Sequence, residues 1–169
     1  MDGVAVSRLM MRALILVVAG LAACTPPPPD VVGRASVIDG DTLEIHDQRI
    51  RLWGVDAPEG RQSCDGADGM AYACGRLAAN RLDQHLQDKT VSCFEEGTDR
   101  YGRLVARCEV DGDDVGAWLV REGLAIRYAR YAGWTYVREE AAAKQNRAGL
   151  WAGRFTEPET WRRVRRGGR

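Results

Sequence analysis

Apolar and polar side chains alternate along the chain soon after a run of prolines. Residues 31–45 alternate on both sides of Asp39-Gly40-Asp41, which predicts two strands joined by a turn. Residues 48–55 predict a further strand, in which Arg49 and Arg51 share one face and apolar residues share the other. A later pair of β-rich runs flanks a polar turn and predicts an antiparallel hairpin.

Three later segments show the spacing of amphipathic helices. Residues 75–86 predict one helix, and the apolar residues that share its face are Leu77, Ala78, Leu82 and Leu86. Residues 114–123 predict a short helix that ends at Gly123, and residues 136–148 predict a third that ends at Gly149. Since strands and helices do not follow a βαβ order, the expected fold is α+β, a small five-stranded β-barrel with three helices.

Composition and charge exclude several classes of protein. The chain has 24 basic and 24 acidic residues, a formal net charge of +0 and 45% hydrophobic residues. These values exclude a disordered tail-like protein and a globally basic nucleic-acid binder. A single short apolar run excludes a polytopic membrane protein. Lysine is nearly absent, so affinity for phosphate must come from locally placed arginines.

The N-terminus has the pattern of an export signal. Residues 14–23 are almost entirely apolar and follow two arginines, but a run of about ten residues is too short to span a bilayer. Leu21-Ala22-Ala23-Cys24 resembles a bacterial lipobox. This resemblance implies a lipoprotein signal peptide over 1–23 and lipidation of Cys24. The alternatives are a plain signal peptide cut near Ala23 and a buried core helix.

Residues 24–32 are expected to form a tether after the lipidated cysteine, because a run of prolines gives stiff polyproline II structure. The expected location is the cell envelope of a bacterium. The lipid anchor would lie in the outer or cytoplasmic membrane, with the domain facing the periplasm or the exterior. No protein partner is indicated, and a monomer is expected.

The remaining cysteines are Cys64, Cys74, Cys93 and Cys108. An even number after an export signal indicates two disulfides, for which three pairings are possible. Cys93 and Cys108 flank a turn at equal distance and would face each other across a hairpin, which leaves Cys64–Cys74 to close a loop before a helix. A zinc site is the alternative, but no Cys-x-x-Cys pair is present.

Carboxylates and guanidiniums gather at predicted strand and turn ends. Asp39, Asp41 and Asp56 lie at such ends, and Glu59 follows closely. Two arginines accompany them, Arg51 on the strand that leads to Asp56 and Arg103 just after the hairpin turn. Carboxylates bind a hard cation such as Ca²⁺, and guanidiniums bind phosphate oxygens. Each motif alone is also typical of a turn, a helix N-terminus or a solvated surface.

Together these residues form four motifs in order, and the chain resembles the staphylococcal nuclease (thermonuclease) family. The motifs are Val37-Ile38-Asp39-Gly40-Asp41-Thr42, Arg51-Leu52-Trp53-Gly54-Val55-Asp56-Ala57-Pro58-Glu59, Asp99-Arg100-Tyr101-Gly102-Arg103 and Leu119-Val120-Arg121-Glu122-Gly123-Leu124-Ala125. The likeness runs from about Gly33 to Trp151, within an expected nuclease domain over residues 33–153. It implies an OB-fold barrel and Ca²⁺-dependent hydrolysis of DNA or RNA.

The resemblance also implies residue roles. Asp41 and Asp56 would hold the metal ion, joined by the backbone carbonyl of Ala57. Glu59 would be the general base or would orient the attacking water. Arg51 and Arg103 would hold the phosphate and stabilise its pentacoordinate state.

The resemblance assigns the aromatic residues less directly. Tyr101 would lie against the terminal phosphate of the nucleotide. The tyrosine that stacks on the nucleotide would be Tyr128, with Tyr131 as the alternative. Ala57 replaces a threonine of the best-known member, so a carbonyl ligand would survive but a hydroxyl would not. That member also lacks the four cysteines.

Two further patterns have competing interpretations. Residues 111–122 match part of an EF-hand loop but are interpreted as a hairpin turn followed by an N-capped helix. Residues 154–169 form an Arg-rich C-terminal tail, which would bind nucleic acid or anionic lipid or form a disordered solubilising end. Alternatives to an enzyme are a non-catalytic OB-fold lipoprotein that binds nucleic acid or another ligand, and a structural envelope lipoprotein.

Overall fold

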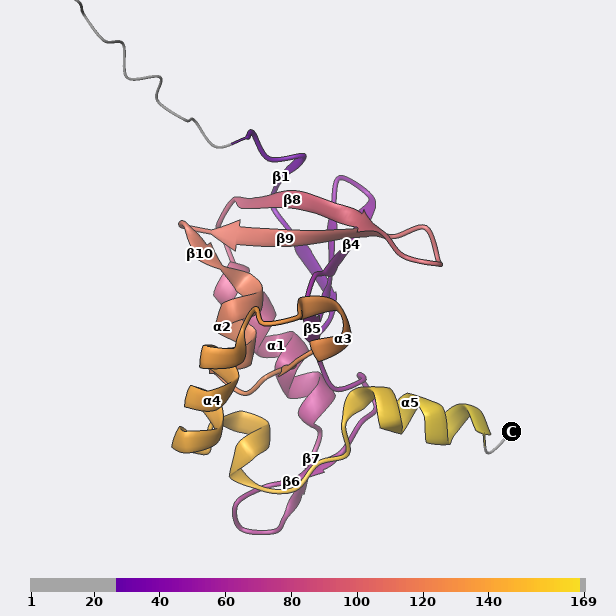
Figure 1. Cartoon of the computed structure of the whole chain (residues 1–169), viewed down its shortest axis with the longest axis vertical. Helices are drawn as coiled ribbons and strands as arrows, with labels where there is room; N and C mark the ends of the chain where they lie inside the picture. Colours follow the sequence, from indigo (N-terminus) through magenta and orange to yellow (C-terminus); the bar gives the residue numbers. More distant parts are fainter. Residues whose placement is uncertain (1–26, 168–169) are drawn as a thin grey trace, which may run out of the picture.

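The computed structural model describes residues 27–167 as an α+β fold, in which a mixed sheet lies above a group of helices (Figure 1). The predicted signal peptide over 1–23 and the lipidation site Cys24 lie outside the described residues. The strands of the main sheet are β1 (Val31–Gly33), β2 (Ser36–Asp39), β3 (Thr42–Ile45), β4 (Gln48–Leu52), β8 (Val91–Thr98), β9 (Leu104–Val110) and β10 (Asp113–Asp114). Their order is β1-β8-β9-β4-β3-β2, with β10 paired to β9.

The predicted alternation explains the inner face of this sheet. Ile50 and Leu52 of β4 are buried, whereas Arg49 on the same strand is exposed. The sequence predicted two strands within residues 31–45, but the structure has three, because β1 pairs with β8 and not with β2.

Residues 48–55, predicted as one strand, are divided between two. β4 stops before Gly54, whose φ is +74°, a conformation that glycine adopts readily. The chain then enters β5 (Val55–Asp56), which pairs with β11 (Ile126–Arg127) in a separate two-stranded sheet. The change of direction at Gly54 places Asp56 outside the main sheet.

One pairing of the main sheet is parallel and brings distant segments together. β4 pairs with β9 in parallel, with Arg51 opposite Val105 and Ile50 opposite Leu104. The pairings of β2 with β3, β3 with β4, and β8 with β9 are antiparallel. This arrangement confirms the OB-like α+β fold. It also sets Arg51 near the start of β9, directly after Arg103.

The helices exceed the predicted number. The predicted ones are present as α1 (Cys74–Leu86), α2 (Val115–Arg121) and α4 (Val137–Asn146). The described residues also contain α3 (Ala129–Ala132), a 3₁₀ turn at Gly149–Ala152 and α5 (Pro158–Gly167). Helix α5 occupies most of the predicted tail, so the alternative of a disordered end is wrong for residues 158–167. No helix within residues 27–167 is long and apolar enough to cross a membrane.

The helices cover the core as their apolar spacing predicted, with one exception. Leu82 and Leu86 of α1 are buried, but Leu77, predicted on the same face, is 42% exposed. Helix α2 is capped by Asp114, whose carboxylate accepts a hydrogen bond from the backbone N–H of Ala117 at 2.9 Å. The turn-and-cap interpretation of residues 111–122 is therefore confirmed.

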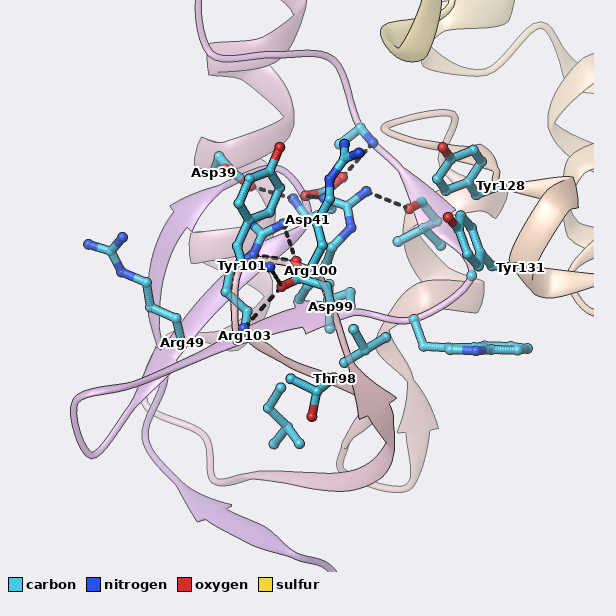
Figure 2. A pocket seen from close by; sticks show the side chains of 18 of the residues that line it. Asp39, Asp41, Arg49, Thr98, Asp99, Arg100, Tyr101, Arg103, Tyr128 and Tyr131 are labelled. Atoms are coloured by element: carbon cyan, nitrogen blue, oxygen red, sulfur yellow. Dashed lines mark hydrogen bonds and ion pairs between the residues drawn. The ribbon is translucent and has the colours of Figure 1, made fainter. Parts of the chain in front are cut away.

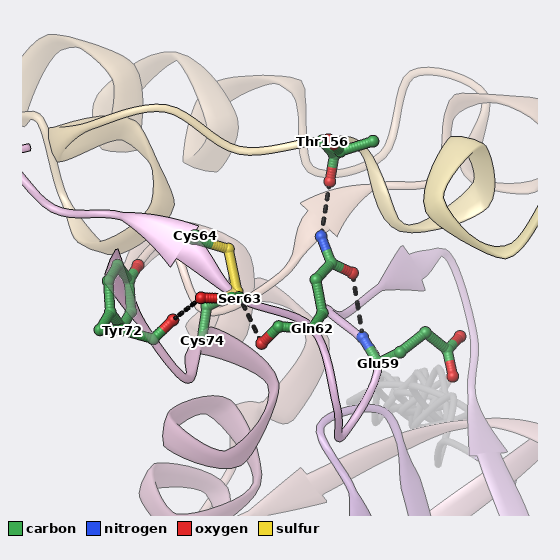
Figure 3. The surroundings of a disulfide bond; sticks show 7 residues. All are labelled: Glu59, Gln62, Ser63, Cys64, Tyr72, Cys74 and Thr156. Atoms are coloured by element: carbon green, nitrogen blue, oxygen red, sulfur yellow. Dashed lines mark hydrogen bonds between the residues drawn. A yellow bond between two sulfur atoms is a disulfide. The ribbon is translucent and has the colours of Figure 1, made fainter. Parts of the chain in front are cut away.

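Both predicted disulfides are present in the structure. Cys93 and Cys108 pair across β8 and β9, at registered positions of the antiparallel hairpin. Cys64 and Cys74 link β6 (Cys64–Asp65) to the first residue of α1, beside β7 (Ala71–Tyr72) (Figure 3). The four cysteines are therefore not zinc ligands here.

Candidate active site

A cleft of about 1230 Å³ lies where β4, β5, the β8–β9 turn, α3 and α5 meet. Seven arginines line it, namely Arg49, Arg51, Arg100, Arg103, Arg130, Arg162 and Arg166. Asp39, Asp41 and Glu59 also line it. In the view of Figure 2, Tyr101 and Arg103 lie on one side of Asp41, and Tyr128 and Tyr131 lie on the other. The cleft therefore brings together most of the residues that the sequence selected.

Asp41 and Asp56 converge on one guanidinium. Arg51 donates from Nη1 to Asp41 Oδ1 at 2.7 Å and from Nη2 to Asp56 Oδ1 at 3.3 Å. The second oxygen of Asp41 accepts a hydrogen bond from the backbone N–H of Ala57 at 3.0 Å. The two turns that carry the acidic residues are thus joined directly.

Gly40 allows this approach. A Cβ atom at position 40 would lie 2.7 Å from the Cβ of Ala57 and 3.0 Å from that of Ala78. The first distance is shorter than packed carbon atoms allow, and the second is tight enough that Ala78 would have to shift. The Asp39-Gly40-Asp41 turn can therefore pack against α1 and against Ala57 only with glycine at its centre.

Both acidic residues are buried, and burial disfavours their charged forms. Burial raises the pKa of Asp41 to about 7, although the Arg51 guanidinium opposes the shift. Burial likewise raises the pKa of Asp56, against hydrogen bonds and charge from Arg162 and Arg51. A nearby cation would therefore favour the charged form of both carboxylates.

The backbone of Glu59 is fixed by a buried glutamine. Gln62 is 1% exposed, its Oε1 accepts from the backbone N–H of Glu59 at 3.2 Å, and its Nε2 donates to the carbonyl of Thr156 at 2.6 Å (Figure 3). The Glu59 carboxylate faces the cleft and accepts from Arg162 Nη1 at 2.7 Å. A carboxylate at this position can accept a proton from a water in the cleft.

Arg103 and Tyr101 come from the β8–β9 turn. Arg103 pairs with Asp99 of that turn and is about one-quarter exposed toward the cleft. Tyr101 is 63% exposed, and the guanidinium carbons of Arg100 and Arg103 lie 5.0 and 5.7 Å from its ring centroid. The turn therefore presents one aromatic ring and two cations to a ligand.

Tyr128 and Tyr131 lie together on the opposite wall. Their ring centroids are 4.9 Å apart in an edge-to-face arrangement. The backbone N–H of Tyr128 donates to the carbonyl of Gly54 at 2.8 Å, which ties this wall to the end of β4. Tyr131 is the more exposed ring, at 59%. Both tyrosines line the cleft, so the geometry leaves the choice between them open.

The donor atoms at Asp41 and Asp56 suit a hard divalent cation. Three carboxylates, of Asp41, Asp56 and Glu59, outnumber the two guanidiniums that contact them, those of Arg51 and Arg162. Carboxylate oxygens are ligands that Ca²⁺ prefers. Among the residues that the structure describes, no three His, Cys, Asp or Glu side chains are grouped closely enough to hold a metal ion by themselves. A cation here would need the Ala57 carbonyl or waters to complete its ligands.

Asp99, Gln62 and Arg162 were not predicted from the sequence as site residues. Asp99 was only part of a motif, and Arg162 only part of the Arg-rich tail. Arg162 bonds to both Asp56 and Glu59. The signal available was the four-residue spacing of Arg162 and Arg166, which places both on one face of a helix that starts at Pro158.

Comparison with known proteins agrees with this geometry. A family model described as "Staphylococcal nuclease homologue" matches residues 49–153. The chain belongs to the staphylococcal nuclease family. The match includes Arg51, Asp56, Glu59 and Arg103, whereas Asp41 precedes it and α5 follows it.

Several known proteins are similar in sequence to this chain. The Rhizobium meliloti "Succinoglycan biosynthesis protein ExoI" is 42% identical over 72% of this chain and 64% of its own length. An "Uncharacterized endonuclease" of Escherichia coli O157:H7 is 33% identical over 73% of this chain and 78% of its own. The Arabidopsis thaliana "Staphylococcal-like nuclease CAN1" is 35% identical over 71% of this chain and 35% of its own length. The chain therefore spans under two thirds of the Rhizobium and plant proteins.

Proposed function

We propose that this protein is a nuclease that hydrolyses phosphodiester bonds of DNA or RNA with the help of Ca²⁺. The observation that carries the proposal is the convergence of Asp41 and Asp56 on Arg51, beside a cleft that Glu59 and Arg103 also line. Membership of the staphylococcal nuclease family supports the proposal, and two of the similar proteins are named as an endonuclease and a staphylococcal-like nuclease.

Asp41, Asp56 and the Ala57 carbonyl would hold the cation. When bound, Ca²⁺ would supply positive charge to a non-bridging phosphate oxygen and offset the charge that grows there during the reaction. Burial raises the pKa of both carboxyl groups, and a bound cation would offset this cost of charging them, which supports the assignment.

The chain's own residues would perform the remaining steps. Glu59 would accept the proton of the attacking water or orient that water toward phosphorus. Arg51 and Arg103 would donate hydrogen bonds to the phosphate oxygens, which carry more charge in the pentacoordinate state than in the substrate. Arg103, at the end of the hairpin turn, would also lie nearest the leaving oxygen.

Aromatic residues would hold the nucleotide on either side of this centre. Tyr101 would contact the terminal phosphate with its hydroxyl. Tyr128 would stack on the base, since base–aromatic stacking is worth about 1–3 kcal/mol per base and tolerates many sequences.

Cleavage of nucleic acid with and without a chelator tests the proposal. We expect the mature domain to cut DNA or RNA with Ca²⁺ present and to stop when a chelator is added. Glu59→Gln and Arg103→Ala should each lower kcat by about 10²-fold or more, since each removes a transition-state contact. Binding without turnover would instead favour a non-catalytic OB-fold protein, and no affinity at low salt would favour a structural lipoprotein.

We also propose that the protein is a monomer anchored to a bacterial envelope membrane through a lipid on Cys24. The lipobox-like sequence supports the anchor, and two disulfides suit an oxidising compartment. Labelling with a radioactive fatty acid tests it. Label on the wild type but not on Cys24→Ala is expected, and equal labelling of the two would contradict the anchor.

A further inference from the structure

Helix α5 places a guanidinium between two carboxylates of the site. Arg162 Nη1 lies 2.9 Å from Asp56 Oδ1 and 2.7 Å from Glu59 Oε1. Its Nη2 donates to Asp56 Oδ2 at 3.0 Å. Both oxygens of Asp56 are therefore engaged by this one side chain, and Oδ1 also accepts from Arg51.

The contact of Arg162 involves the two carboxylates to which the proposed function assigns metal binding and water activation, those of Asp56 and Glu59. Asp56 is 1% exposed and does not itself line the cleft, whereas Arg51 and Arg162, which contact its carboxylate, do. A cation entering from the cleft would therefore meet these two guanidiniums first. Arg162 occupies part of this approach, and its side chain is itself only 22% exposed. A divalent cation and a guanidinium at the same oxygens repel each other, so the two compete for Asp56.

The segment that leads to α5 is fixed to the loop after Glu59. The carbonyl of Thr156 accepts from the buried Gln62 side chain, and the backbones of Asp65 and Arg154 exchange hydrogen bonds at 2.8 and 3.2 Å. Pro158 at the start of the helix is buried, whereas the residues from 163 onward are exposed. Figure 1 shows α5 extending from the body toward the C-terminus. The anchored start holds Arg162 beside Glu59, while the residues from 163 onward are exposed.

We propose that Arg162 is an internal cation that competes with the divalent metal for Asp56 and pairs with Glu59 until that metal binds. This inference rests on the proposed function, since it assumes that the metal binds at Asp56. Loading the site would require the guanidinium to leave both carboxylates. A bound phosphodiester would give the displaced guanidinium a new anionic partner in the cleft, in addition to carboxylates such as Glu159 that also line it. Metal and nucleic acid should therefore bind cooperatively.

Calorimetric titration with Ca²⁺, in the absence of nucleic acid, tests the competition. Arg162→Gln should bind Ca²⁺ at least about fivefold more tightly than the wild type, which is within the usual range of coupling between sites. Arg163→Gln is the matched control, because it removes the same charge from the same helix at an exposed position. Its Ca²⁺ affinity should equal that of the wild type. Arg162→Lys keeps the charge but loses the two-pronged contact and should be intermediate.

Each outcome bears on the inference. Equal or weaker binding by Arg162→Gln would overturn it, and chelator-sensitive cleavage by the wild type would then leave the proposed function standing. Equal gains in Arg162→Gln and Arg163→Gln would also overturn it, because net charge alone would explain them. If neither the wild type nor Arg162→Gln bound Ca²⁺, the inference and the metal site would both be wrong. Circular dichroism should show the same helix content in all variants.

Discussion

Asp99 holds the guanidinium of Arg103 with one oxygen and organises the hairpin turn with the other. Asp99 Oδ2 accepts from Arg103 Nε at 2.8 Å and lies 2.7 Å from its Nη2. Oδ1 accepts from the backbone N–H groups of Tyr101 and Arg103 at 2.8 and 3.0 Å. Although burial opposes the effect, these hydrogen bonds lower the pKa of Asp99, so it stays charged beside Arg103.

We expect Asp99→Asn to lower kcat by between about 10- and 100-fold, because a small misplacement of a group that contacts the transition state has effects of that size. The amide keeps an oxygen for the turn but loses the charge that orients Arg103. Steady-state cleavage kinetics would measure the change. Asp111→Asn removes a surface partner of Lys89 at the other end of the sheet and should leave kcat unchanged. A wild-type kcat for Asp99→Asn would contradict the positioning role.

Tyr136→Phe should lower the free energy of unfolding by about 1–3 kcal/mol, because the Tyr136 hydroxyl donates to Asp114, the cap of α2, at 2.9 Å. Burial and the Asp114 charge raise the pKa of Tyr136 above its ordinary 10.0. The unfolded chain therefore ionises first, and the contribution of Tyr136 is present below pH 10 and lost as the pH rises further. Denaturant unfolding at several pH values should show the gap between wild type and variant closing above pH 10. A constant gap would contradict the shift.

Removal of the hairpin disulfide should destabilise the protein strongly. Cys93 and Cys108 are 15 residues apart and both are buried in the core. The double variant Cys93→Ala/Cys108→Ala should lose about 3 kcal/mol of stability, the value expected from the freedom that an unfolded loop of that length regains. Thermal unfolding would measure it. The pair Cys64→Ala/Cys74→Ala opens a shorter loop, since these cysteines are 10 residues apart, and should lose somewhat less. The reverse order would contradict the account.

Binding of Ca²⁺ should weaken at acid pH. Burial raises the pKa of Asp41 to about 7, and a metal ligand must be deprotonated. The affinity for Ca²⁺ should therefore reach its maximum well above pH 7 and fall by up to about tenfold for each pH unit below it. Calorimetry between pH 6 and 8, in buffers with different ionisation enthalpies, would report both the affinity and the proton released. A pH-independent affinity without proton release would exclude Asp41 as the titrating ligand.

Much of the sheet could be predicted because burial of one face imposes a period of two. Ile50 and Leu52 follow this rule, and Cys93 and Cys108 meet at the register that their spacing around the turn implies. The break at Gly54 was not predictable from alternation, since apolar residues continue on both sides of it. Helix α5 was not predicted, because Pro158 is its one buried residue and the residues from 163 onward are exposed, so it has little of the apolar face that marks a helix in a sequence.

The site could be predicted from residue types and order, but its contacts could not. The sequence predicted a site that includes Asp41, Asp56 and Arg51. In the structure, the Arg51 guanidinium donates hydrogen bonds to both carboxylates. Sequence reasoning had no means of finding the bond between Arg162 and Glu59, because the two are separated by most of the chain and belong to no shared motif. Asp99 was visible as a turn residue, and only the fold shows its hold on Arg103.

The parallel pairing of β4 with β9 has a consequence for how this protein can tolerate changes in length. Because Arg51 is registered with Val105, hydrogen bonds of the sheet set the separation of Arg51 from Arg103, and the long chain between them does not. Insertions or deletions around residues 64–72 would alter the outline of the molecule without moving either arginine. A slip of one residue within β9 would turn every side chain of that strand to the opposite face.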